Sequence, residues 1–369
     1  MPIVEIHTDQ YRVPLETPLS DSTHGEMSDF GLVVVRLVDE RGQIGLGYTY
    51  TVNNIGTGAI WKIIDSDLVP LLQGADPGAI DTLWKKMWWR LHFVGRGGMA
   101  SFAMAAVDIA LWDLRGQRES LPLWRLLGGD CAEVPAYAGG IDLDLSVQGL
   151  CAQAEGFLDQ GFHAIKMKVG RARLSEDVER VSAMRELLGP NFPLMADANM
   201  RWSTDQAIAA ADALEKFGLF WLEEPIVPED LAGHARLGQE TRVPIATGEN
   251  LHSVHEFEHL MAYGHVDFPE PDAATLGGIT PWIEVAKIAQ DRGLPVTSHG
   301  IHDIHVHLLA GVPNASYLEV HGFGLERFLE QRLQFKEGKA IAPDSPGHGV
   351  ALDLDGLRPF RQATGSSHD

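Results

Sequence analysis

Two lysines separated by a single residue are the first candidates for chemistry in this chain. Lys166 and Lys168 flank Met167 in a short apolar run that predicts a β-strand. Because the side chains of a strand alternate between its two faces, both ammonium groups point to the same side. Two like charges this close depress each other's pKa, which suits a lysine to act as a base near neutral pH. The competing interpretation is a pair of exposed lysines on an edge strand, since lysine is mostly exposed in proteins.

Three acidic residues favour the catalytic interpretation. Asp197, Glu223 and Glu249 each end a strand-like segment or follow it closely, and they succeed one another at equal intervals of 26 residues. Carboxylates that converge on one point need a hard divalent cation between them. Mg²⁺ fits, because it takes a few carboxylates and keeps positions open for water or substrate oxygens. Each acid alone would be read as a solvated loop charge or a helix N-cap, but together they predict one Mg²⁺ ion per subunit.

A second acid–base group is expected opposite the lysines. His299 ends a later strand, and Asp272 follows the strand before it. A carboxylate that is bonded to one imidazole nitrogen fixes the tautomer and raises the basicity of the other nitrogen. His299 could then remove or deliver a proton opposite Lys168, whereas without Asp272 it would be read as a helix cap. Glu319, near the end of the last strand, is expected to act as a protonated donor to a carboxylate oxygen of the substrate.

The elements that must position these residues form a repeat of short apolar strands, each followed by a helical pattern. Eight such units predict an α/β fold of the TIM type, either a (β/α)8 barrel or a (β/α)7β variant with an irregular last helix. Active sites of such barrels lie at the carboxyl ends of the strands, where all the residues above occur. The predicted strands are 134–137, 164–169, 193–197, 219–223, 244–247, 266–269, 295–298 and 317–320.

Two further segments flank the predicted barrel. Residues 1–125 are expected to form an α+β domain, because a hairpin over 32–50 is followed by helical patterns over 79–91 and 101–116. Residues 126–337 hold the barrel. The turn-rich segment 338–369 is expected to return to the N-terminal domain.

Composition argues against several classes of function. The 51 acidic and 29 basic residues give a net charge of −22, which disfavours binding to nucleic acid or to an anionic membrane surface. No segment approaches the roughly 20 apolar residues that a membrane-spanning helix needs. Cys131 and Cys151 belong to no metal or redox motif. We expect a cytoplasmic protein that acts on a small-molecule carboxylate.

Taken together, these motifs resemble those of the enolase superfamily, and in particular its mandelate racemase subgroup. The resemblance covers nearly the whole chain and includes the helix over residues 106–114 and the Ser-Pro-Gly turn at 345–347. The matching stretches that carry polar groups are 165–170, 196–199, 222–225, 248–250, 271–272, 277–280, 298–299 and 318–319.

The resemblance implies a role for each residue. Asp197, Glu223 and Glu249 would hold Mg²⁺, and the ion together with Lys166 would bind the substrate carboxylate. Lys168 on one face and the His299–Asp272 pair on the other would move protons at the carbon next to it. Mg²⁺ would stabilise the enediolate that forms on deprotonation. Asn199, which lies in one of the matching motifs, is a candidate substrate contact, and a dimer-based assembly, often an octamer, is implied.

The N-terminal domain would then cap the barrel, with a lid loop at about residues 19–30 closing over its mouth. The lid sequence is polar, which suits a hydroxylated substrate because a buried hydroxyl needs partners. The alternative is a polar loop that is merely solvated. His24 and Arg96 are candidates for contact with the distal end of the substrate. Gly139 and Gly140 stand where mandelate racemase supplies a hydroxyl, so carboxylate binding is expected to rest on Lys166 and Glu319.

The sequence favours a Mg²⁺-dependent dehydratase of an acid sugar, an aldonate or aldarate. Loss of the α-proton and of the β-hydroxyl would give a 2-keto-3-deoxy acid. A racemase or epimerase that uses the same Lys168 and His299 is the main rival, since bases on both faces also permit inversion. A non-catalytic binding protein on the same scaffold is the third hypothesis, and the filled acid, base and ligand positions speak against it.

Overall fold

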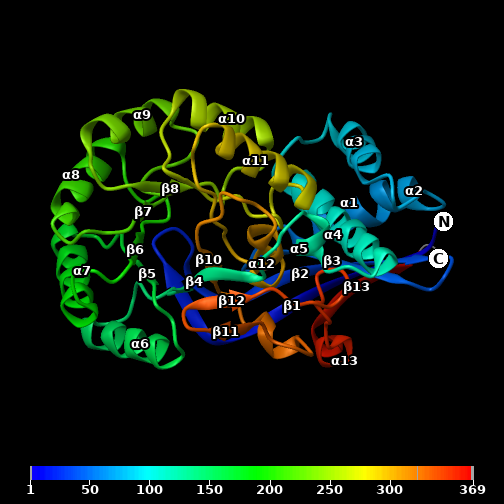
Figure 1. The fold of residues 1–369 in the computed structure, drawn as a ribbon, viewed down its shortest axis with the longest axis horizontal. Coiled ribbons are helices and arrows are strands. Elements are labelled where there is room, and N and C mark those ends of the chain that lie inside the picture. The colour runs from blue at the N-terminus through cyan, green and yellow to red at the C-terminus, as the bar shows by residue number, and fades with distance from the viewer. Residues whose placement is uncertain (1, 322, 367–369) are drawn as a thin grey trace.

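An antiparallel sheet and a parallel barrel form the two parts of the fold (Figure 1). The computed structural model describes residues 2–321 and 323–366. The antiparallel sheet has the strand order β13-β1-β2-β3, and the predicted hairpin is confirmed as its β2–β3 pair. Its strands are β1 (Ile3–Asp21), β2 (Gly25–Asp39), β3 (Ile44–Val52) and β13 (Arg361–Ser366).

Helices of the N-terminal domain cover one face of this sheet. The long helix α4 packs closely on β3 because Gly45 and Gly47 carry no Cβ, which would collide with the backbone carbonyls of Ala106 and Ala110. This domain contains α1 (Thr57–Ile63), a π-helical turn (Ile64–Leu68), α2 (Val69–Leu72), α3 (Ile80–Leu91), α4 (Met99–Glu119) and α5 (Leu123–Leu126).

The barrel strands run parallel from β4 to β9, and β10 closes the ring by pairing with β4. They are β4 (Glu133–Gly139), β5 (Ile165–Lys168), β6 (Leu194–Asp197), β7 (Leu222–Glu223), β8 (Ile245–Thr247), β9 (Phe268–Pro269) and β10 (Leu318–Val320). The helices outside them are α6 (Val147–Asp159), α7 (Leu174–Leu188), α8 (Thr204–Glu215), α9 (Leu231–Glu240), α10 (Val254–Tyr263), α11 (Ile279–Asp291) and α12 (His302–Ala310).

The predicted seventh strand is not a regular strand in the structure. At 295–298 a single bridge joins Val296 to Ala315, and Thr297 N–H donates to the Pro269 carbonyl at 3.0 Å. Pro295 has no N–H to donate to a ladder, which shortens the pairing at this point. The last strand, β10, is followed by a 3₁₀ helix (Leu325–Phe328) rather than by a barrel helix. The barrel is therefore the (β/α)7β variant with a reduced seventh strand.

The C-terminal segment touches both parts of the fold. Strands β11 (Gln334–Lys336) and β12 (Lys339–Ile341) form a hairpin, and β12 pairs with β4 of the barrel. Helix α13 (Leu354–Leu357) and a 3₁₀ turn (Arg358–Phe360) lead into β13, which pairs with β1. The last described strand thus lies beside the N-terminal strand.

Polar contacts fix the N-terminal domain against the barrel. Asp108 of α4 accepts hydrogen bonds from the backbone N–H and the hydroxyl of Thr280, both at 2.8 Å, at the start of α11. The Trp112 indole donates to the same hydroxyl at 2.9 Å. These contacts hold the sheet in place, so that the β1–β2 ribbon can reach the carboxyl ends of the barrel strands.

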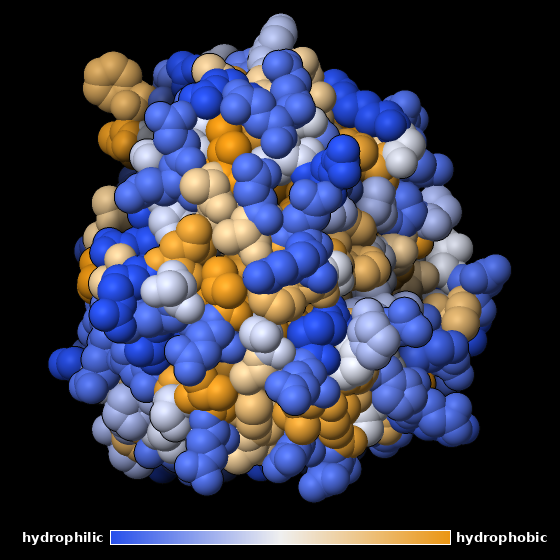
Figure 2. Space-filling model, turned by 90° about the vertical axis from the view of Figure 1, so that its left-hand side faces the viewer, coloured by the Kyte–Doolittle hydropathy of each residue, from blue (hydrophilic) through white to orange (hydrophobic). Residues whose placement is uncertain are grey.

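The outer face of the barrel carries mostly polar side chains. Figure 2 shows hydrophilic groups protruding over most of this face, with apolar side chains lying between them. No helix within residues 2–321 and 323–366 is long and apolar enough to cross a bilayer.

Candidate active site

Strand β5 places both lysines inside the barrel. Lys166 and Lys168 are buried, with 1% and 5% of their surface exposed, so they are not solvent-exposed residues of an edge strand. Lys166 Nζ contacts Glu223 and lies 2.8 Å from Glu319 Oε1, while Lys168 Nζ contacts Asp197. Alternation along β5 therefore brings both ammonium groups to one ring of carboxylates.

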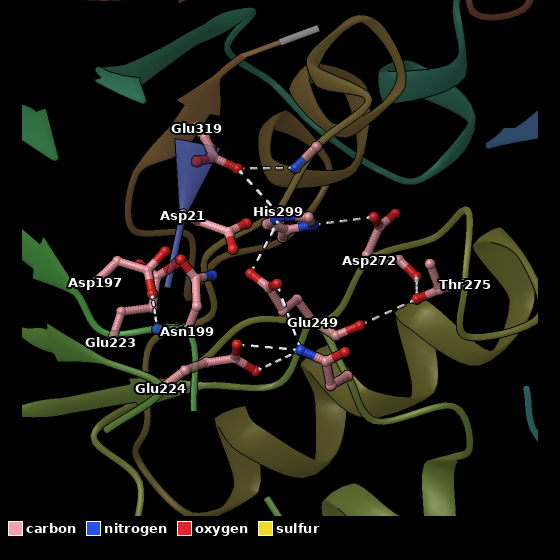
Figure 3. A network of polar contacts seen from close by, with 12 residues as sticks. Asp21, Asp197, Asn199, Glu223, Glu224, Glu249, Asp272, Thr275, His299 and Glu319 are labelled. Carbon is pink, nitrogen blue, oxygen red and sulfur yellow. Dashed lines mark hydrogen bonds and ion pairs between the residues drawn. The ribbon is translucent and has the colours of Figure 1, made fainter. Parts of the chain in front are cut away.

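The predicted metal ligands meet at the carboxyl ends of three neighbouring strands. Asp197 ends β6, Glu223 ends β7, and Glu249 follows β8. One oxygen from each lies within 4.8 Å of the others, and the first two residues are fully buried. The next acid, Glu224, turns away with φ 40° and accepts hydrogen bonds from the Asn250 amide at 2.8 and 3.1 Å (Figure 3).

The charges at this point fit a hard divalent cation. Burial and the charges of Asp197 and Glu319 raise the pKa of Glu223 to about 8, although the charge of Lys166 acts to lower it. The pKa of Glu249 is also raised by burial. Burial therefore disfavours the charged form of these carboxylates, and a bound cation would offset that cost. Three carboxylates offering one oxygen each are a donor set that Mg²⁺ accepts. These residues form a metal site.

The expected net lowering of the lysine pKa values is wrong, although the charge of Lys166 does act to lower the pKa of Lys168. Burial lowers the pKa of Lys166, but the charges of Glu223 and Glu319 outweigh burial and raise this pKa well above its usual value. Asp197 in the same way raises the pKa of Lys168. Contact with a carboxylate outweighs repulsion between two ammonium groups. A divalent cation on the three acids would take over part of the charge neutralisation that the lysines provide.

His299 lies on the other side of the ring, between carboxylates. Its Nδ1 is 3.2 Å from Asp272 Oδ2, and its Nε2 is 3.1 Å from Glu249 Oε2 (Figure 3). Burial lowers the pKa of the imidazole, but the charge of Glu249 and the Asp272 hydrogen bond outweigh it and raise the pKa to about 10. Since both ring nitrogens face carboxylate oxygens, the arrangement favours the protonated imidazole.

Tyr50 of β3 adds a contact that the sequence did not indicate. Its hydroxyl donates to Asp272 Oδ2 at 2.8 Å and lies 3.3 Å from His299 Nδ1. The other Asp272 oxygen accepts from the Ala274 N–H at 2.7 Å. The carboxylate that orients His299 is therefore itself held by the N-terminal domain. A tyrosine in a strand gives no sequence signal for such a role.

His305 ties together the two loops that carry Asp272 and His299. Its Nε2 accepts from the Ala273 N–H at 3.0 Å, so its Nδ1 carries the proton and donates to the Gly300 carbonyl at 2.9 Å. Gly300 has φ +59°, and a Cβ there would lie 2.6 Å from the Tyr50 oxygen. The histidine-rich run after His299 thus serves packing and loop geometry at this position.

Glu319 is not the protonated donor that the sequence suggested. Its Oε2 accepts from the Gly300 N–H at 2.9 Å, and its Oε1 accepts from Lys166. Burial alone would raise its pKa, but Lys166 and His299 outweigh burial and lower the pKa. An ionised Glu319 therefore orients Lys166. A Cβ at Gly139 would lie 2.7 Å from Glu319 Oε1, which explains why no side chain stands there.

The lid is the tip of the β1–β2 ribbon and is docked on the barrel. The Ser22 hydroxyl donates to the Ala198 carbonyl at 2.7 Å, and the Thr23 hydroxyl donates to the Asn199 carbonyl. The polarity of the lid is therefore used largely to fasten it. His24 Nδ1 lies 2.8 Å from Asp21 Oδ2, and this hydrogen bond raises the pKa of the imidazole.

A cavity of about 380 Å³ lies between the lid, β3 and the barrel mouth. Lys168, Glu249 and His299 form its floor, and Asn199 Oδ1, which has no hydrogen-bond partner in the described part of the chain, also belongs to its lining. His24 and Asp21 line the lid side. Much of the remaining wall is apolar: Met27, Tyr50, Val52, Ile55, Ile60, Met99, Phe102, Ile141 and Phe323.

Arg96 is not brought to this cavity. Its guanidinium stacks over Trp88, 5.6 Å from the ring centroid, and it lines a separate cavity of about 150 Å³. The described residues that line the catalytic cavity include no arginine. Lys166, Lys168, His299, Asp272 and Glu319 surround the metal site as predicted, and His24 and Asn199 border the cavity.

Comparison with known families agrees with this geometry. Residues 149–356 match the family described as enolase C-terminal domain-like, and residues 3–128 match the mandelate racemase and muconate lactonizing enzyme N-terminal domain. The chain belongs to the enolase superfamily. Within it, the chain falls in the mandelate racemase and muconate lactonizing subgroup, among acid-sugar relatives. The predicted fold class, with its capping domain, is confirmed.

Two relatives are similar to this protein over almost the whole chain. A 3,6-anhydro-α-L-galactonate cycloisomerase from Streptomyces coelicolor is 53% identical over 96% of this chain and 98% of its own length. An L-talarate/galactarate dehydratase from Salmonella typhimurium is 35% identical, covering 94% of this chain and 88% of its own.

Solved structures of superfamily members superpose closely and contain magnesium. A protein described as a racemase from Streptomyces coelicolor A3(2), with bound magnesium, has TM-score 0.95 and 51% identity and covers 98% of this chain and 100% of its own. The structure of the Salmonella dehydratase with Mg and L-lyxarohydroxamate has TM-score 0.94 and 33% identity, and it covers 99% of this chain and 94% of its own. The chain is thus an enzyme of a magnesium-dependent superfamily.

Proposed function

We propose that this enzyme opens the ring of a 3,6-anhydro aldonic acid by β-elimination, giving a 2-keto-3-deoxy acid. The composition of the catalytic cavity is the observation that carries this proposal. Its wall is largely apolar, and among the described lining residues no arginine is available for a second carboxylate. A cyclic monoacid has one carboxylate and an ether in place of hydroxyls, so it leaves fewer buried polar groups without partners.

The catalytic residues would bind such a substrate by its carboxylate. Lys166, oriented by Glu319, would contact a carboxylate oxygen beside Asp197, Glu223 and Glu249, which would hold Mg²⁺. The ion would supply positive charge where the carboxylate gains negative charge as the adjacent carbon loses its proton. Asn199, with its unpartnered oxygen, and His24 would accept and donate hydrogen bonds to the hydroxyls.

Lys168 and His299 would then divide the proton transfers. Lys168, which would be a neutral amine when Asp197 holds Mg²⁺ instead of the ammonium group, removes the proton from C2. The C3–O bond of the ring breaks, and a C2–C3 double bond forms. His299 gives its proton to the departing ring oxygen, which stays attached through C6. The enol takes a proton at C3 and releases the proton of its C2 hydroxyl, and so becomes the ketone. No atom is lost, so the net reaction is an isomerisation.

The relatives support this choice of leaving group. The Streptomyces coelicolor protein at 53% identity is described as a cycloisomerase of 3,6-anhydro-α-L-galactonate. The same two residues could expel a β-hydroxyl from an open-chain acid, and the Salmonella dehydratase at 35% identity favours this second candidate. Both reactions share the α-proton abstraction predicted from sequence.

Proton NMR in D₂O would distinguish these reactions. The enzyme with Mg²⁺ would be incubated separately with 3,6-anhydro-L-galactonate and with open-chain aldonates and aldarates. We expect a new C3 signal of the 3-deoxy product, carrying one solvent deuteron, from the anhydro acid. If only the open-chain acids gave this signal, the enzyme would be a dehydratase and the ring-opening proposal would be wrong. Loss of the α-proton signal without a C3 product would mean racemisation or epimerisation.

A further inference from the structure

A second pair of aspartate and histidine faces the catalytic cavity, and this pair belongs to the lid. His24 Nδ1 lies 2.8 Å from Asp21 Oδ2, and the other Asp21 oxygen accepts from the backbone N–H groups of Thr23 and His24 at 2.8 and 2.6 Å. Both residues of the pair line the cavity whose floor contains Lys168 and His299. Asp21 can be seen beside the ring of charged residues in Figure 3.

The lid pair has the arrangement that Asp272 and His299 have in the barrel. Burial raises the pKa of Asp21, but the hydrogen bonds from His24 outweigh burial and lower it. An ionised Asp21 only accepts, so Nδ1 of His24 donates to it and Nε2 is the nitrogen left for a ligand. The hydrogen bond to Asp21 raises the pKa of His24, although burial acts to lower it. The pair therefore favours an imidazolium that carries a proton on Nε2.

The ring opening proposed above leaves one proton without a donor. Lys168 takes the proton from C2, and His299 gives its proton to the departing oxygen. The enol still has to gain a proton at C3. Because the carboxylate of the substrate would lie at the metal site, C3 lies one bond farther from the ion than C2 does, on the way to the lid.

Among the described residues of the cavity wall, few groups other than His24 hold a proton that they could give. The Tyr50 hydroxyl already donates within the protein, and burial lowers the pKa of the His252 imidazole. His299 has given up its proton in the preceding step. Lys168, which holds the proton from C2, is the rival donor, but it is only 5% exposed. The His24 side chain is 36% exposed, so it can regain a proton from water after each turnover.

We infer that His24 is a third catalytic residue, which protonates C3 of the enol from the lid side of the cavity. The electron pair of the C2–C3 double bond forms the new C3–H bond with the proton of Nε2. The enol hydroxyl releases its proton to water as the C2 carbonyl forms, and water returns a proton to Nε2. The inference rests on the proposed function, but not on the leaving group, because ring opening and dehydration produce the same kind of enol.

The stereochemistry of deuterium at C3 tests this assignment. In D₂O with Mg²⁺, the wild-type enzyme should place its deuteron at one of the two C3 positions, which proton NMR distinguishes by their couplings. His24→Gln should release the enol to ketonise in water, so that both C3 positions carry deuterium in roughly equal amounts. His252→Gln is the matched control, since His252 also lines the cavity, and it should keep a single position. A single position in His24→Gln would overturn the inference, because the proton would then come from another donor such as Lys168.

A second measurement needs no turnover. NMR titration of the His24 ring in the protein with Mg²⁺ should give a pKa above the ordinary value of about 6.5, and Asp21→Asn should lower it. The charges of Asp21 and Glu249 act to raise this pKa, whereas burial and the charge of Lys168 act to lower it. A pKa below the ordinary value in the wild type would overturn the inference, since His24 would then be mostly neutral at pH 7.

The two proposals fail in different ways. A wild-type enzyme that forms no 3-deoxy product from any acid would remove the proposed function and this inference together. A wild-type enzyme that forms the product, with His24→Gln giving the same single C3 position, would remove the inference alone.

Discussion

The hydroxyl of Tyr50 offers a sharp test of how the capping domain supports catalysis. Tyr50→Phe removes one oxygen that donates to buried Asp272 at 2.8 Å and keeps the ring that lines the cavity. A hydrogen bond to an ionised group contributes about 1.5–3 kcal/mol. If the whole of this hydrogen-bond free energy is lost in the transition state, kcat/KM falls roughly 10- to 150-fold, because about 1.36 kcal/mol corresponds to a factor of ten in rate. We expect the change in kcat, with KM little affected.

Tyr48→Phe is the matched control for this variant. Tyr48 lies two residues earlier on β3, is fully buried, and its hydroxyl has no hydrogen-bond partner among the described residues. Removing that hydroxyl should leave kcat/KM unchanged and should not lower the thermal midpoint. Steady-state kinetics and thermal unfolding of both variants would be compared with Mg²⁺ in excess. Wild-type kinetics for Tyr50→Phe, or an equal loss in Tyr48→Phe, would refute the proposed support of Asp272.

Four other outcomes follow from the same contacts. Lys168→Ala should abolish turnover while circular dichroism shows an intact fold, and substantial residual turnover would remove Lys168 from the mechanism. Chelation of Mg²⁺ with EDTA should stop turnover and lower the thermal midpoint. The reason is that an ion present at 100 times its Kd stabilises the fold by about 2.7 kcal/mol. Activity that survives dialysis against the chelator would contradict the metal site. Gly300→Ala, at φ +59° and with its Cβ 2.6 Å from the Tyr50 oxygen, should cost roughly 1–3 kcal/mol in chemical denaturation, and an unchanged midpoint would argue against this packing. The hydrogen bond to Asp267 raises the pKa of His265, so its stabilisation is present below the ordinary imidazole pKa and disappears as pH rises through the raised value. His265→Gln should therefore lower the thermal midpoint more at pH 6 than at pH 9, whereas equal losses would show that the pair does not titrate in this way.

The ring of charged residues could be predicted because it follows from local rules. Alternation along a strand places Lys166 and Lys168 together, and parallel strands in a barrel end at one rim. Three acids that each end one strand of such a repeat must therefore meet. Local patterns also predicted the barrel and an α+β N-terminal domain, and the family resemblance implied that this domain caps the barrel; the family comparison confirms this fold. These features depend on sequence spacing rather than on distant contacts.

The remaining features depend on contacts between residues far apart in the chain. Ser22 fastens the lid to a carbonyl 176 positions away, and Tyr50 meets an acid 222 positions away. Neither partner could be inferred from the residue itself. Arg96 was misplaced for the same reason, because it stacks on Trp88 instead of reaching the cavity. The ionisation of Glu319 is likewise set by Lys166 and His299, which only the folded chain brings beside it.

Product analysis with an isotopically labelled substrate tests the central claim most directly. The enzyme with Mg²⁺ would be given 3,6-anhydro-L-galactonate with ¹⁸O in the ring, and the product mass would be measured in ordinary water. Ring opening by Lys168 and His299 predicts a 2-keto-3-deoxy product of unchanged mass that retains the label, and no product with Lys168→Ala. A product that has lost water or the label, or an anhydro acid left unconsumed while an open-chain acid is dehydrated, would contradict the account.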